Sequence, residues 1–224
     1  MINIDTNKIM RGSPPPLEYQ VMLENWRKHP YNIWSFVNVR SIIPTSPIKS
    51  DPKQKINFNK KLIDLSDMKI SHNNSVKNLN EILINCNTDS LLVMHKGKLV
   101  FEYYNNFTAH DTPHIIFSIS KSLTSLLTGI LVNKNIINLN NLVTDVLPET
   151  IGTSYEDATI RNVLDMNVAS NFIEDYSGEA EIFKKYRSST GWDIPSKEEN
   201  SLTGLHDFLS NMPKSNYSHG KKYH

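Results

Sequence analysis

The sequence lacks the features that define several large classes of protein. Its 224 residues contain one cysteine, Cys86, which cannot form an internal disulfide and so gives no sign of an oxidising compartment or a cysteine-based zinc site. We expect Cys86 to be a small buried side chain rather than a reactive thiol. Glycine is scarce, with 8 residues, and none of them builds a glycine-rich phosphate loop. This absence disfavours a nucleotide enzyme.

An excess of charge of one sign is also missing. The sequence has 24 lysines and arginines against 23 aspartates and glutamates, which leaves no basic field to attract nucleic acid or anionic lipid. No apolar run is long enough to span a membrane, and residues 1–5 do not begin a signal peptide. We therefore expect a cytoplasmic protein that binds neither nucleic acid nor membrane.

Proline and aromatic residues are concentrated in the first quarter of the chain. Residues 11–57 contain three consecutive prolines, Pro14 to Pro16, which favour an extended backbone. Large rings such as Trp26, Trp34 and Phe36 are interleaved with them, and a free linker seldom carries so many. We expect residues 1–57 to form an arm that packs on a globular body, residues 58–224. A partly disordered leader is the alternative.

The body shows helical and strand patterns that together predict an α+β fold. A helix is expected over residues 76–86, followed by strands over 90–94 and 99–104 with Gly97 in the turn between them. A long amphipathic helix is expected over 119–133, and it is too hydrophobic to lie on the surface, so we expect it to be buried. The region 170–200 has the composition of loops. The pattern predicts shorter helices over residues 142–147, 159–166 and 201–211.

Ser118 and Lys121 form the one motif with clear chemical content. They lie three residues apart at the start of the long helix, so their side chains point the same way from adjacent turns. A serine hydroxyl becomes a good nucleophile when a nearby base takes its proton, and a lysine amine can be that base when it is uncharged. Burial near a helix N-terminus disfavours the charged amine. The alternative is an exposed helix start with Ser118 as N-cap.

The residues around this motif resemble a known family. Residues 114–129 are similar to the active-site helix of serine β-lactamase-like hydrolases, which include class C β-lactamases, DD-peptidases and esterases. The 6-aminohexanoate-dimer hydrolase group is the most similar subgroup. The resemblance implies a β-lactamase/transpeptidase-like fold, an antiparallel sheet flanked by helices, with the C-terminal strands missing from this chain. It extends to residues 12–16, 25–27, 32–36, 40–45, 160–166, 172–176 and 191–192.

The resemblance also assigns roles to single residues. Ser118 is the expected acylated nucleophile and Lys121 its base. Tyr176 and Trp192 are expected to line the substrate pocket, although Tyr176 can equally be a loop residue that covers the core and Trp192 a hydrophobic anchor. The implied substrate is a small ester or amide, linear or β-lactam-like. No metal or organic cofactor is implied, and a homodimer is compatible with the resemblance.

One departure from the family pattern qualifies the expected activity. The family uses a catalytic tyrosine about a hundred residues after the serine, and Tyr223 matches the aromatic residue just before it. We therefore expect a C-terminally truncated relative, and an inactive binding module is the second hypothesis. A true β-lactamase or DD-peptidase is a third, disfavoured by the aromatic arm and the absence of a signal peptide, because those enzymes act outside the cytoplasm.

Overall fold

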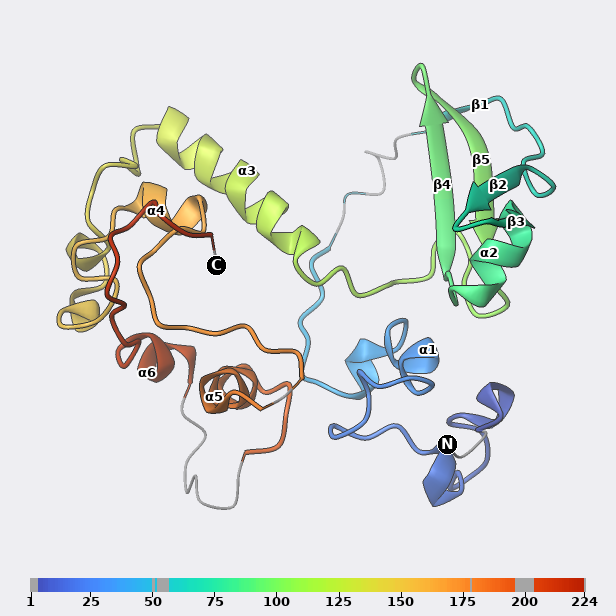
Figure 1. The fold of residues 1–224 in the computed structure, drawn as a ribbon, viewed down its shortest axis with the longest axis horizontal. Coiled ribbons are helices and arrows are strands. Elements are labelled where there is room, and N and C mark those ends of the chain that lie inside the picture. The colour runs from blue at the N-terminus through green and yellow to red at the C-terminus, as the bar shows by residue number, and fades with distance from the viewer. Residues whose placement is uncertain (1–3, 50, 52–56, 178, 196–203, 224) are drawn as a thin grey trace. The chain divides into compact units, whose positions relative to one another are not determined.

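The computed structural model describes residues 4–49, 51, 57–177, 179–195 and 204–223. The chain divides into two compact units, Met1–Ile115 and Ile116–His224. The strands, labelled in Figure 1, are β1 (Asn59–Lys60), β2 (Lys69–His72), β3 (Ser75–Asn78), β4 (Ser90–His95) and β5 (Lys98–Tyr104). The helices are α1 (Asn32–Ser35), α2 (Leu79–Asn85), α3 (Ile119–Asn133), α4 (Ile160–Leu164), α5 (Glu181–Ser189) and α6 (Leu205–Leu209).

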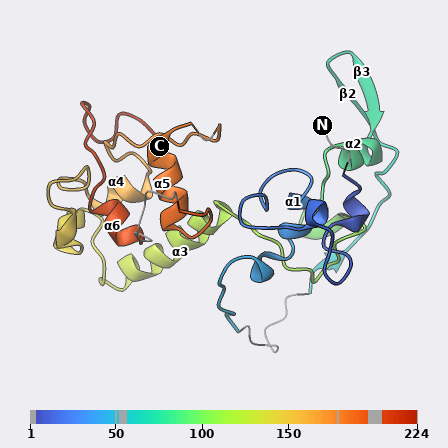
Figure 2. The same cartoon turned by 90° about the horizontal axis from the view of Figure 1, so that it is seen from below.

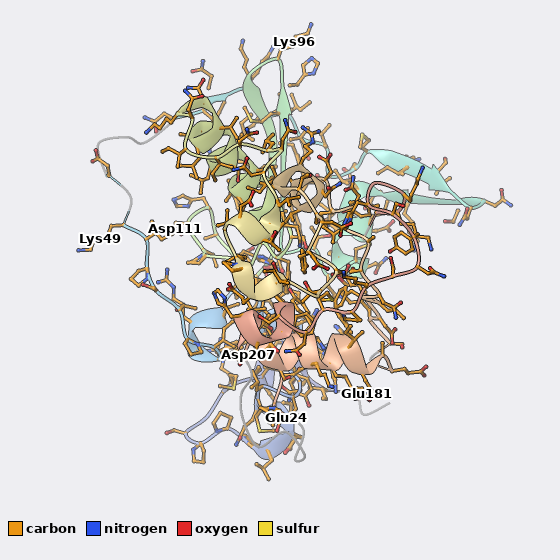
Figure 3. The ribbon with its side chains drawn as sticks, turned by 90° about the vertical axis from the view of Figure 1, so that its left-hand side faces the viewer. Glu24, Lys49, Lys96, Asp111, Glu181 and Asp207 are labelled. Atoms are coloured by element: carbon orange, nitrogen blue, oxygen red, sulfur yellow. The ribbon has the colours of Figure 1, made fainter. Side chains whose placement is uncertain are left out.

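The predicted hairpin is confirmed and forms the sheet of the first unit. β4 and β5 pair antiparallel, and Lys96 and Gly97 turn the chain with φ of 48° and 73°. Two positive φ values in a two-residue loop match the right-handed twist of the strands. Figure 3 shows Lys96 at this tip. The β4–β5 pair is antiparallel, as expected, and β1 adds a parallel edge strand to β5, so the sheet has the order β1-β5-β4.

The helix predicted over residues 76–86 is shorter than expected, because its first residues are a strand. β3 pairs antiparallel with β2. The two strands form a ribbon that starts beside α2 and projects away from it (Figure 2). The helix begins at Leu79 because Asn78 and Glu81 form a capping box, with hydrogen bonds of 2.7 and 3.0 Å between their side chains and amides. Cys86, expected to be buried, is exposed just after the helix end.

The core of the first unit joins α2 to the sheet. Leu79, Leu83 and Phe101 are buried together, with partly buried apolar side chains from the strands around them. In the arm, Trp26 is fully buried and its ring meets the edge of Phe36 at 6.3 Å. The described arm residues therefore contribute a packed ring to this unit. The boundary at residues 57–58 between arm and body remains a prediction.

The second unit begins with α3, which has the predicted bounds. A short 3-10 turn at Val143–Asp145 stands where a helix over residues 142–147 was predicted, and a second 3-10 turn, Pro148–Thr150, follows that range. The helix expected over 159–166 is α4, which starts at a capping box of Thr159 and Asn162. The prediction of loops over 170–200 is wrong where α5 forms. α6 is shorter than the helix predicted over 201–211, whose residues 201–203 lie outside the described part.

Buried side chains of the second unit come from segments after α3. One cluster contains Val143, Ala158 and Val168. A second group is aromatic: Phe172 lies within 6.2 Å of the rings of Phe183, Tyr186 and Phe208. No helix in the described residues is long and apolar enough to cross a membrane.

The apolar face of α3 is exposed, which corrects the expectation that this helix is buried. Leu123, Leu126, Leu127 and Ile130 are each more than half accessible to solvent. The reason is that, in the described residues, both buried groups of the second unit are built without α3 side chains. Hydroxyl groups elsewhere on the helix bond to its own backbone: Thr124 Oγ1 donates to the Ser120 carbonyl and Thr128 Oγ1 to the Thr124 carbonyl.

Candidate active site

Ser118 and Lys121 are brought together at the start of α3. The Nζ of Lys121 donates to the Oγ of Ser118 at 2.8 Å. Ser118 occupies the N-cap position with helical backbone angles, φ −68° and ψ −10°, and its side chain makes no capping hydrogen bond. A serine that served only to cap the helix would direct its hydroxyl to the amides of the first turn. The geometry therefore favours the pairing over the capping alternative.

Phe117, just before Ser118, has a strained backbone. Its φ is 40°, in the left-handed region that a residue with a Cβ enters at a cost of about 1–2 kcal/mol. The carbonyl of Phe117 accepts two hydrogen bonds from Ser120, one from the amide at 3.1 Å and one from the hydroxyl at 2.5 Å. The Lys121 amide donates to the Ser118 carbonyl at 3.0 Å. The conformation of Phe117 thus sets the first turn in which the pair lies.

The surroundings of the pair differ from those expected. Both Ser118 and Lys121 are exposed, whereas the sequence pattern led us to expect a buried helix start that disfavours the charged amine. No residue of α3 is buried in the part of the chain that the structure describes, and the Ser118–Lys121 pair shares this exposure. The structure supplies the hydrogen-bonding distance between the two groups but not, in the described residues, their desolvation.

Trp192 lies against the residue that precedes Ser118. The rings of Trp192 and Phe117 meet edge to face, with centroids 5.7 Å apart and planes at 73°. The end of α5 presents Trp192: the Gly191 amide donates to the Ser188 carbonyl at 2.9 Å, and the Trp192 amide donates to the Arg187 carbonyl at 3.0 Å. These two bonds, with Gly191 at φ 72°, form a Schellman motif.

Tyr176 lies in the chain between Phe172 and α5 and is 78% exposed. Its hydroxyl donates to Glu174 and its ring meets the edge of Phe183 at 5.3 Å. The hydrogen bond to the Glu174 carboxylate, together with burial, raises the pKa of the Tyr176 hydroxyl. Tyr176 is thus held by Glu174 of its own loop and by Phe183 of α5, whereas Trp192 contacts the residue next to the serine.

Among the described residues, no group of three histidine, cysteine, aspartate or glutamate side chains could hold a metal ion. Residues 84–207 match the sequence model of the Beta-lactamase family, a span that contains Ser118, Lys121, Tyr176 and Trp192. The chain belongs to the Beta-lactamase family. Its α+β fold is accordingly β-lactamase/transpeptidase-like, as the resemblance implied.

The chain is also similar to one curated protein and to one solved structure. It is 27% identical over 191 residues to the 6-aminohexanoate-dimer hydrolase of Paenarthrobacter ureafaciens, covering 85% of this chain and 46% of that protein. It also resembles, with a TM-score of 0.83 and 23% identity, the solved structure of a Bacillus anthracis protein provisionally assigned as a 6-aminohexanoate-dimer hydrolase. That match covers 93% of this chain and 55% of the solved one, so the chain spans about half the length of these relatives.

Two features of this candidate site were not anticipated from the sequence. The ring of Phe117 supports Trp192, and Gly191 fixes the direction in which Trp192 leaves α5. A glycine after a helical pattern is a detectable signal, but α5 itself was missed. Tyr223, not expected to be catalytic, is 77% exposed, and its hydroxyl lies 3.5 Å from the sulfur of Met166.

Proposed function

We propose that the protein is a serine hydrolase that cleaves an ester or an amide through an acyl-enzyme on Ser118, with Lys121 as general base. The proposal is carried by one observation, the 2.8 Å hydrogen bond between Lys121 Nζ and Ser118 Oγ. This is the distance at which an uncharged amine can take a hydroxyl proton directly. Membership of the Beta-lactamase family supports the same chemistry.

In this mechanism Ser118 Oγ attacks the substrate carbonyl carbon while its proton passes to the uncharged Lys121 amine. The carbonyl oxygen becomes an oxyanion, whose charge the positive end of the α3 dipole favours. The tetrahedral intermediate then expels an alcohol or an amine, which needs a proton. That proton comes from the Lys121 ammonium, passed directly or through a tyrosine of the kind that the family resemblance implies. Water finally attacks the acyl group on Ser118 and releases the acid.

The substrate class proposed is a small linear amide or ester. The relative from Paenarthrobacter ureafaciens is named for the hydrolysis of a 6-aminohexanoate dimer, which is a linear amide. Tyr176 and Trp192 are the proposed substrate-contacting residues. The exposure of the Tyr176 ring and the contact of Trp192 with the residue next to Ser118 support these two roles.

The solvent exposure of the catalytic pair supports a second candidate, a binding module without turnover. Water stabilises the charged form of an amine, and a charged amine cannot accept the serine proton. In that case the fold and the hydrogen bond are retained, but the serine is not activated.

Covalent labelling separates the two candidates. We expect a fluorophosphonate probe, and a fluorescent penicillin if the site accepts β-lactams, to modify Ser118, as located by mass spectrometry. Ser118→Ala should abolish the modification, and Lys121→Met should slow it by about 10²–10⁴-fold, the usual contribution of a general base. Ser122→Ala is the matched control, because it removes an exposed hydroxyl from the same helix. Labelling that persists in folded Ser118→Ala excludes the hydrolase assignment, and unlabelled wild-type protein supports the binding module.

A further inference from the structure

Trp192 is anchored to α5 on both sides. Before it, the Schellman motif at Gly191 fixes the backbone. After it, Asp193 pairs with Arg187 at 2.8 Å, and the two side chains are only 24% and 18% exposed. The guanidinium of Arg187 also lies 5.1 Å from the centre of the Phe183 ring. The backbone that carries Trp192 is therefore fixed on both sides, unlike that of a tryptophan in an ordinary loop.

The anchored Trp192 side chain contacts the ring of Phe117. Phe117 holds a left-handed φ of 40°, and such a conformation in a bulky residue persists only where its surroundings hold it. Because its carbonyl bonds both the amide and the hydroxyl of Ser120, a return of Phe117 to an ordinary conformation would reorganise the first turn of α3. The hydroxyl of Ser118 would then lose its direction toward Lys121.

We propose that Trp192 is a positioning residue for the nucleophile: by its edge-to-face contact it holds Phe117 in the left-handed conformation and so keeps Ser118 aimed at Lys121. The inference rests on the proposed function for its catalytic consequence. It differs from a role in the pocket wall, because Trp192 then acts on the serine whatever the substrate is.

A double-mutant cycle with two readouts tests the proposal on the full chain. The variants are Trp192→Leu, Phe117→Leu, the double variant and the conservative Trp192→Phe, which keeps an aromatic edge. The matched control is Tyr186→Leu, which removes a ring of α5 that contacts Phe172 and Phe208. The first readout is the labelling rate of Ser118 by a small fluorophosphonate, per folded molecule. The second is hydrogen exchange at the Ser120 and Lys121 amides.

We expect Trp192→Leu and Phe117→Leu each to slow labelling about tenfold, and the double variant to be no slower than either alone. Trp192→Phe should recover most of the rate. Exchange at the Ser120 and Lys121 amides should accelerate in Trp192→Leu and stay unchanged in Tyr186→Leu. For a larger ester, the positioning role lowers kcat, in addition to any rise in KM from the lost substrate contact of Trp192.

Other outcomes overturn the proposal. Additive effects with unchanged amide exchange, or a change in KM alone, would assign Trp192 to the pocket wall. If wild-type protein is not labelled at all, the proposed function fails, and the exchange data alone decide the positioning role. In that case, faster amide exchange in Trp192→Leu would support the role of Trp192 in holding Phe117, and unchanged exchange would refute it.

Discussion

The carboxylate of Asp175 organises the loop that carries Tyr176. One of its oxygens accepts hydrogen bonds from the hydroxyl and the amide of Ser177 at 2.6 and 2.9 Å, and the other accepts from the amides of Glu179 and Ala180 at 2.9 and 2.8 Å. Such donors stabilise the ionised form, the Ser177 hydroxyl most of all, and lower the pKa of Asp175 from 3.8 to about 2. Asp175 therefore serves the backbone and not proton transfer.

This arrangement predicts a pH-dependent stability. A carboxyl whose folded pKa is depressed stabilises the fold above its unfolded pKa of 3.8, and the contribution disappears as pH falls toward about 2. We expect Asp175→Asn to be less stable than wild type at about pH 7 and the difference to shrink below about pH 4. Urea unfolding at a series of pH values measures it, with exposed Asp111→Asn as control. A difference that persists unchanged at about pH 2 would contradict the assignment.

The helices and strands that depend on local sequence signals were predicted well. The β4–β5 hairpin follows from Gly97 between two apolar runs, and α3 from its uninterrupted helical spacing. The β2–β3 ribbon was missed although Asn73 and Asn74 take left-handed φ values of 45° and 59°, which asparagine tolerates well. α5 was missed because its Phe183 and Tyr186 are stabilised by Phe172 and Phe208, rings that come from other segments.

Two glycines at helices predict opposite effects of the same substitution. Gly191→Ala should destabilise the protein by about 1–2 kcal/mol, because φ there is 72° and alanine is strained in that conformation although space is open. Gly129 lies inside α3 with nothing within 4 Å of an added Cβ, so Gly129→Ala should stabilise by about 0.5–1 kcal/mol. Urea unfolding of both variants checks the signs, and equal effects would refute the comparison.

The folding of the chain also depends on residues that are remote in sequence from the candidate site. Trp26 of the arm is fully buried although its segment is irregular and rich in proline. The site itself was predicted only in part: the spacing of Ser118 and Lys121 is local and readable, whereas their exposure depends on what covers α3.

Truncation of the buried ring tests the contribution of the arm. We expect Trp26→Ala to lower the free energy of unfolding by about 3–5 kcal/mol, the usual cost of removing a large buried aromatic. Ile48→Ala, at a position that is 97% exposed in the same arm, should change it by less than about 0.5 kcal/mol. Far-UV circular dichroism during urea unfolding measures both. Equal stability of the two variants would show that the arm is a loose leader.

The hydroxyl groups of α3 carry a consequence for any surface that approaches this helix. The hydroxyl groups of Ser120, Thr124 and Thr128 already donate hydrogen bonds to backbone carbonyl groups in the preceding turn. An apolar surface could pack over these positions without burying an unsatisfied hydroxyl donor. The cost of burying such a donor is what usually keeps polar residues out of apolar contacts. These side chains of α3 are therefore compatible with burial against an apolar surface, although no residue of the helix is buried.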